Sequence, residues 1–169
     1  MSTTALDAEE LARHLERPHS AWGHDLTARG LVPDPRSRAY GLALQISGAE
    51  PDTPAHTAVW LVLALAGYRR IGACGSEVSL GAHAGAAAGP AAGVDRRLLQ
   101  AIGIPGQAAE QTVKAVAELC RSRPGPAGRP DPVVLAADLA VMFGEDPDAR
   151  RAVANRWSKD HRSARASRA

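Results

Sequence analysis

A glycine- and alanine-rich stretch at residues 78–102 divides this chain and limits the folds open to it. Glycine recurs there at every fourth position from Gly81 to Gly93. Pro90 interrupts any helix, because its ring removes a backbone donor and clashes with the preceding turn. No Gly-Lys-Ser/Thr follows the glycines and no strand pattern precedes them, which excludes a phosphate-binding loop. The spacing therefore indicates close helix packing and a flexible connector.

Helix caps, breakers and apolar periodicity predict an all-α protein. We expect two small helical bundles joined by this Gly/Ala-rich hinge, the first at residues 1–89 and the second at residues 90–169. Hydrophobic residues make up 45% of the chain, but aromatic residues only 4% and much of the remainder is alanine. That composition suits packed helices better than a β-sandwich, which needs many β-branched and aromatic side chains.

Two helix starts are especially clear, because a capping side chain precedes a proline at both Thr53-Pro54 and Asp146-Pro147. The full pattern predicts helices over residues 4–17, 54–70, 94–102, 106–121, 132–143 and from 147 toward 161. Thr4 is expected to cap the first helix. Residues 21–52, which are rich in breakers, are predicted to form a long, partly ordered loop, and the pattern does not decide between helix and extended structure for residues 40–46.

Catalysis and metal binding find no support in the residue pattern. Cys74 and Cys120 form no Cys-x-x-Cys pair, and we expect both to be reduced core cysteines. His14, His19 and His24 lie five residues apart rather than at the i, i+4 spacing of helical metal sites, so solvated histidines are expected. No nucleophile stands near a base and an orienting partner, which predicts a protein that is not an enzyme and needs no cofactor.

The apolar runs are short. The longest, residues 58–67, is about half of what a membrane-spanning helix needs. The chain opens with small polar residues that run into acidic ones, which is not the pattern of a secretory signal peptide. We therefore expect a cytoplasmic protein with no membrane partner.

Acidic and basic side chains are separated along the chain. Residues 60–129 and 150–169 carry an excess of basic side chains, whereas residues 1–59 and 130–149 carry an excess of acidic ones. Arginine dominates the basic set, and because it binds phosphate with two donors and stacks on bases, this bias fits a nucleic-acid partner. A GC-rich genome would give the same bias. The candidate nucleic-acid-binding residues are Arg69, Arg70, Arg96, Arg97, Lys114, Arg121, Arg123, Arg150, Arg151, Arg156, Lys159 and Arg162.

Two pairs among these candidates have contrasting helix positions. Arg69 and Arg70 are expected in the last turn of the 54–70 helix, where they complement the helix dipole, so capping and phosphate contact are both open for them. Arg96 and Arg97 are expected in the first turn of the 94–102 helix, where a cation opposes the dipole. A pair placed against the dipole favours an anionic partner.

Four strings occur in an order and spacing that resemble the small subunit (CasB family) of the type I-E CRISPR Cascade complex. They are Val78-Ser79-Leu80-Gly81, Asp95-Arg96-Arg97-Leu98-Leu99, Leu135-Ala136-Ala137-Asp138-Leu139 with Phe143, and Arg156-Trp157-Ser158-Lys159-Asp160. The likeness covers residues 54–162. The chain departs from the family pattern at Ala82, at residues 104–106 and at His161-Arg162.

The resemblance implies an all-helical, non-catalytic subunit that serves antiviral defence. Its implied partners are CRISPR guide RNA and target DNA, bound through their backbones, together with the backbone and large Cascade subunits and a second copy of itself. Such a subunit stabilises guide–target pairing and the displaced strand during R-loop formation. The alternative is a free-standing helical DNA-binding regulator, which would need a polar recognition helix. Residues 107–121 are too apolar and acidic for that role.

Overall fold

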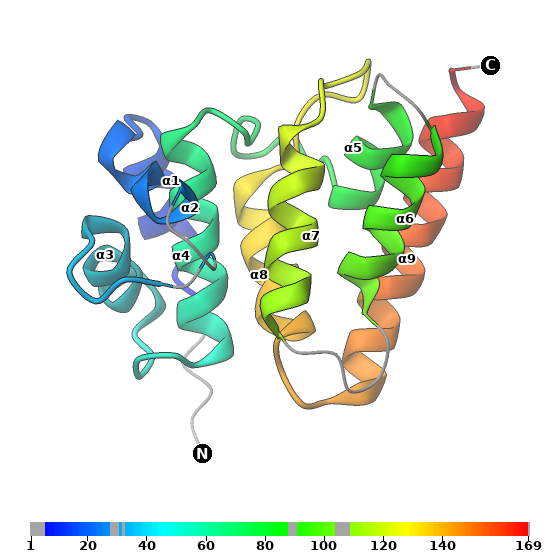
Figure 1. The fold of residues 1–169 in the computed structure, drawn as a ribbon. Coiled ribbons are helices and arrows are strands. Elements are labelled where there is room, and N and C mark those ends of the chain that lie inside the picture. Colours follow the sequence, from blue (N-terminus) through cyan, green and yellow to red (C-terminus); the bar gives the residue numbers. More distant parts are fainter. Residues whose placement is uncertain (1–5, 28–30, 32, 88–90, 104–108, 169) are drawn as a thin grey trace.

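The computed structural model describes residues 6–27, 31, 33–87, 91–103 and 109–168. Within these ranges the protein is all-helical, as predicted, and forms no β-strand (Figure 1). In chain order the elements are α1 (Ala8–Leu15), the 3-10 turn η1 (Ser20–Gly23), α2 (His24–Thr27), α3 (Arg38–Ser47), α4 (Pro54–Gly67), α5 (Leu80–Ala86), α6 (Ala91–Ile102), α7 (Ala109–Arg121), α8 (Pro132–Met142) and α9 (Pro147–Ala166).

Helix α4 lies at the centre of the core. The Thr53 hydroxyl accepts the His56 N–H at 3.4 Å and Pro54 takes the first helical position, as the sequence predicts. Residues 58–66 are all buried, because the helix is apolar around its whole circumference. The turn η1 and helix α3 cover one side of α4 and α8 covers another (Figure 1).

Helices α5 and α9 approach each other closely. A Cβ atom at Gly81 would lie 2.0 Å from the Trp157 carbonyl oxygen, and one at Gly85 would lie 2.2 Å from the His161 carbonyl oxygen. Only glycine permits this approach, so the predicted close packing is confirmed at these two positions. The Asp146 cap of α9 is also confirmed, and Trp157 on that helix is fully buried.

The hinge and the two-bundle arrangement are not confirmed. One continuous hydrophobic core joins residues of α4, such as Leu61, with Leu119, Leu139 and Trp157 from the second half of the chain. The residues of the expected hinge form α5 and α6, which pack against α9 and α7. The expected boundary falls at residues 88–90, outside the described ranges, so the division of the chain there stays a prediction.

The loop predicted over residues 21–52 is wrong for much of its length. The Ser37 hydroxyl accepts the Tyr40 N–H at 3.1 Å and starts α3, and Gly48 ends it in the left-handed region at φ 58°. Tyr40 and Ile46 on this helix are buried in the core. Serine and glycine, which suggest a loop in the sequence, act here as helix caps.

Helix α1 starts later than predicted. Asp7 caps it by accepting the Glu10 N–H at 2.9 Å, and the expected cap, Thr4, lies outside the described residues. The sequence has capping residues at both Thr4 and Asp7, and the aspartate provides the cap that is described. The expected start of the 106–121 helix also lies outside the described residues.

Helix α4 ends earlier than predicted, at Gly67. A Cβ at Gly67 would lie 2.4 Å from the Gly23 backbone nitrogen, so the helix end packs closely on η1. Arg69 and Arg70 therefore follow the helix instead of filling its last turn, and Arg69 has a left-handed backbone at φ 54°. This corrects the dipole-capping position expected for both arginines.

Candidate nucleic-acid interface

A groove of about 540 Å³ lies between α6 and α7, and three of the predicted basic residues line it. Buried Val94, Leu98 and Ala101 form the inner face of α6. That spacing turns the side chains of Arg96 and Arg97 to the groove. Because α6 begins at Ala91, both arginines lie in its second turn, so the first-turn position against the helix dipole that the sequence predicts is wrong. The full lining is Arg96, Arg97, Gln100, Gln111, Lys114, Ala115 and Glu118.

Among the described residues, the groove lining has three basic side chains and one carboxylate. Glu118 is the one carboxylate among the described lining residues, and it lies 4.0 Å from Arg97 and 3.2 Å from Arg121. Arg96 and Lys114 form no ion pair with any residue that the structure describes. The groove thus carries a net positive charge with donors from two helices, an arrangement that suits an anion.

The positive surface extends from the groove to the loop after α4. Burial lowers the pKa of Arg70, and the nearby Arg121 guanidinium lowers it further by like-charge repulsion. The Arg70 guanidinium carbon lies 4.8 Å from the centre of the Tyr68 ring, which holds it in place by a cation–π contact. Arg70 and Arg121 therefore extend the same cationic surface beyond Lys114.

Arg150 and Arg151 line a separate, smaller hollow of about 250 Å³ where the end of α6 meets the start of α9. Arg151 forms an ion pair with Asp148 at 3.5 Å, and both side chains are largely exposed. An exposed pair of this kind contributes little to stability. These two residues are accessible, but they do not line the α6–α7 groove.

Arg156 forms an ion pair within the protein that the sequence pattern does not predict. Its guanidinium pairs with the nearly buried carboxylate of Asp138, which also accepts the Trp157 indole N–H at 2.7 Å. These contacts join α8 to α9. Arg156 therefore helps to hold two helices together, while about half of its side chain stays exposed.

The remaining candidates are scattered. Lys159 and Arg162 are exposed on α9, and Arg123 is exposed after α7. Arg69 lines a different hollow, near α1. Of the twelve predicted residues, the structure thus brings together Arg70, Arg96, Arg97, Lys114 and Arg121.

Two groove residues, Gln100 and Gln111, were missed by selecting basic residues alone. Gln100 follows Arg96 by four residues and Gln111 precedes Lys114 by three, so both share a helix face with a basic candidate. This helical spacing from the basic candidates is the sequence signal that predicts both glutamines in the groove. Their amides can donate hydrogen bonds to phosphate oxygens or sugars without reading bases.

The segments 78–81, 95–99, 135–139 and 156–160 meet at α9. The Ser79 hydroxyl donates to Asp160 at 2.6 Å, and Asp95 pairs with His161 at 3.0 Å and Arg165 at 2.8 Å. The bond from Arg165 is the main reason that the pKa of Asp95 is lowered. With Gly81 and Asp138 packed on the same helix, these segments form one structural unit that positions the α6–α7 pair.

Across the described ranges, no group of three or more His, Cys, Asp or Glu side chains is arranged to hold a metal ion. None of the helices in those ranges is long and apolar enough to cross a membrane. No family model, curated protein sequence or solved structure matched this chain.

Proposed function

We propose that this protein is a non-catalytic, nucleic-acid-backbone-binding subunit of a CRISPR RNA-guided surveillance complex of the Cascade type. It stabilises the pairing of guide RNA with target DNA, and it holds the displaced strand, as part of antiviral defence. It works in the cytoplasm beside the backbone and large subunits and a second copy of itself. The observation that carries the proposal is the cationic α6–α7 groove with its surplus of arginine and lysine.

The chemistry of the groove supports backbone binding rather than base reading. Arg96, Arg97 and Lys114 come from two helices and face one hollow, where phosphates spaced along a strand can contact them in turn. Base reading would need a helix that presents polar side chains to base edges, whereas Arg96, Arg97 and Lys114 face the hollow between α6 and α7. Sequence specificity would then come from pairing with the guide.

The test measures target-DNA binding by complexes assembled with the other Cascade subunits and guide RNA. The subunit is wild type or carries Arg96→Ala and Arg97→Ala. We expect weaker binding and a smaller dependence on salt, by about 0.7 to 0.9 in log–log slope for each phosphate that the variant no longer binds. The isolated subunit should bind only weakly, because the complex supplies the positioning.

Arg13→Ala with Arg36→Ala is the matched control, since it removes the same charge from exposed residues of the N-terminal half. That variant should keep wild-type affinity and salt slope. Equal affinity and slope for the Arg96/Arg97 variant would remove the groove from the interface. A free protein that does not assemble but binds duplex DNA with sequence preference would instead support the regulator.

A further inference from the structure

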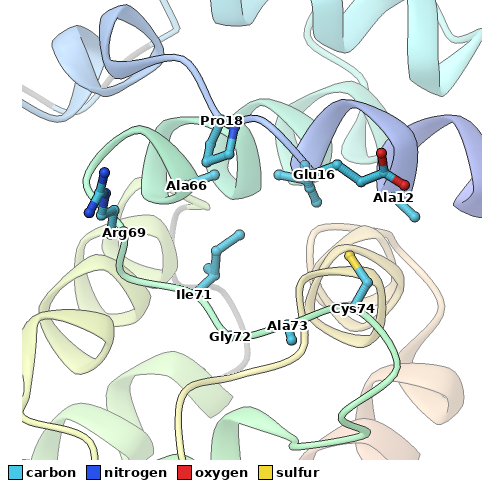
Figure 2. A pocket seen from close by; sticks show the side chains of 10 residues that line it. Ala12, Glu16, Pro18, Ala66, Arg69, Ile71, Gly72, Ala73 and Cys74 are labelled. Carbon is cyan, nitrogen blue, oxygen red and sulfur yellow. The ribbon is translucent and has the colours of Figure 1, made fainter.

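A second groove lies on the N-terminal side of the molecule, between α1, the loop after α4 and the start of α8. One hollow of about 610 Å³ lies between α1 and that loop (Figure 2). A neighbouring hollow of about 460 Å³ reaches the first turn of α8. Ala12 and Cys74 line both hollows, so the two form one continuous groove, here called the acidic groove.

The lining of the acidic groove is apolar and most of its charges are negative. Apolar side chains lie along it, with Leu15 and Ile71 in the first hollow and Val133 and Val134 in the second. The carboxylates that line it are those of Glu9, Glu16, Glu77 and Asp131. Arg69 is the one basic residue among the described lining residues, and Figure 2 shows it at the opposite end from Glu16 and Cys74.

These negative charges act on the same point of the groove. Partial desolvation by the groove walls raises the pKa of the exposed Cys74 thiol, and the charges of Asp131 and Glu16 raise it further. Glu9, Glu16 and Glu77 form no ion pair with any residue in the described part of the chain. Three carboxylates therefore remain available to a positively charged partner.

The wall formed by the loop is held in place by backbone hydrogen bonds. The Gly72 N–H donates to the Pro130 carbonyl at 2.7 Å, and the Asp131 N–H donates to the Val78 carbonyl at 2.8 Å. The Glu77 N–H donates to the Asp131 carboxylate at 3.0 Å. A groove that is formed before binding avoids the entropy cost of ordering its walls.

We propose that the acidic groove docks a basic amphipathic segment of a partner protein. Apolar side chains of the segment would fill the two hollows, and its Lys or Arg side chains would lie beside Glu9, Glu16 and Glu77. Nucleic acid does not fit, because these carboxylates repel phosphates. This partner differs from that of the α6–α7 groove, and the inference does not depend on the proposed function.

A small-molecule ligand fits the groove less well. Small-molecule sites usually place several convergent polar groups around a mostly apolar pocket. Across the described residues, every buried side-chain nitrogen and oxygen already has a hydrogen-bond partner within the protein, so none of them requires one from a ligand. The available charges lie on exposed glutamates, which suits the flanking cations of a protein segment.

The experiment selects binders to the whole protein from a display library of short random peptides. Cys74 is exposed and Cys120 is fully buried, so alkylation by iodoacetamide reports on the acidic groove. We expect the selected peptides to combine large apolar residues with Lys or Arg. At saturation they should slow Cys74 alkylation by about tenfold or more.

The groove variant combines Glu9→Gln, Glu16→Gln and Glu77→Gln, and the control combines Glu50→Gln, Glu110→Gln and Glu145→Gln at exposed positions outside the lining. Circular dichroism should give equal helicity for both. Peptide binding should fall about tenfold or more in the first variant only. Selected peptides that are acidic, that leave Cys74 alkylation unchanged or that bind both variants equally would overturn the proposal, as would a selection that enriches no peptide.

Discussion

Asp138 is a nearly buried carboxylate whose contacts come from the next helix. Its two oxygens accept from the Arg156 guanidinium and from the Trp157 indole, and Trp157 is fully buried. A buried carboxylate is tolerated only when its charge and its lone pairs are satisfied. The side chain thus fixes how α9 sits on α8, and through α9 it affects α5 and α6.

Replacing Asp138 with alanine should destabilise the protein by about 1–3 kcal/mol, because the buried Trp157 N–H loses its acceptor. The Arg156 guanidinium adds less, since half of that side chain is exposed and can be solvated. Asp138→Asn should lose less, because the amide oxygen still accepts from the indole. Urea unfolding of the wild type and the two variants measures their free energies of unfolding.

Glu145→Ala, in an exposed loop, serves as the control and should change stability by less than about 0.5 kcal/mol. If Asp138→Ala were as stable as this control, the α8–α9 contact would not depend on the carboxylate.

His56 gives the protein a second residue-level property, a dependence of stability on acid. It is fully buried; its Nδ1 accepts the Asp52 N–H at 3.1 Å and its Nε2 donates to the Tyr40 carbonyl at 3.3 Å. Burial lowers the pKa of His56 below the ordinary 6.5. Below pH 6.5, His56 binds a proton in the unfolded chain but stays neutral in the folded protein, which favours unfolding. The contribution of His56 to stability is therefore full above pH 6.5 and decreases as the pH falls toward the folded-state pKa.

We therefore expect a lower free energy of unfolding at about pH 5.5 than at about pH 7.5, with part of the difference removed by His56→Gln. The glutamine can replace both hydrogen bonds without titrating. Urea unfolding of both proteins at both pH values makes the measurement. A variant with the whole wild-type pH difference would show that other groups cause it.

At the scale of elements, the spacing of glycines has different consequences in α5 and α6. In α5, Gly81 and Gly85 face the backbone of α9 with no room for a methyl group. In α6, a Cβ at Gly93 would meet no atom within 4 Å. One sequence pattern thus includes positions where glycine is required for packing and a position where it is not.

Gly81→Ala and Gly93→Ala should change stability in opposite directions. Alanine favours a helix over glycine by about 1 kcal/mol, so Gly93→Ala should stabilise the protein by up to that amount. At Gly81 the methyl group would overlap the Trp157 carbonyl and force the helices apart, which typically costs about 1–3 kcal/mol. Thermal unfolding of the two variants compares them directly, and a stabilised Gly81→Ala protein would contradict the packing described for α5 and α9.

The elements that the sequence predicts well are those whose start signals are local. Thr53-Pro54 and Asp146-Pro147 contain both the cap and the fixed proline φ, so their helices follow from two neighbouring residues. The sequence pattern leaves helix and extended structure open for residues 40–46 of α3, because the core contacts of this helix are made by a few residues, including Tyr40 and Ile46, among small ones. Its stability comes from packing on α4, which no local pattern reports.

The candidate site also has a part that the sequence predicts and a part that only the tertiary structure shows. The basic residues could be named from the sequence, but Arg96 and Lys114 share a groove only because α6 packs on α7. Arg156 looked like an exposed basic residue, and its partner Asp138 lies on another helix. Which cations face one another, and which already have a partner, depends on tertiary contacts between elements.

At the scale of the whole molecule, the shared core predicts one cooperative unfolding transition for both halves of the chain. Trp60 in α4 and Trp157 in α9 are both fully buried. A Trp22→Phe/Trp60→Phe variant keeps only Trp157, and a Trp157→Phe variant keeps only Trp22 and Trp60. Tryptophan fluorescence of both variants should therefore report loss of structure together with the helical circular dichroism of the same sample. Separate urea midpoints for fluorescence and circular dichroism in either variant would show two independently stable bundles.

The pairing of α5 with α9 also bears on how the chain reaches this structure. The hydrogen bond between Ser79 and Asp160 joins residues 81 positions apart in the sequence. The contact between α4 and α8 likewise joins segments that are distant in the sequence. Contacts so distant in sequence slow folding, because a long loop has to close before they form. Stopped-flow refolding should therefore be slower than for helical bundles built from neighbouring hairpins. During synthesis, the face of α4 that packs on α8 stays uncovered until α8 leaves the ribosome, so the nascent chain exposes this apolar face while the residues between the two helices are made.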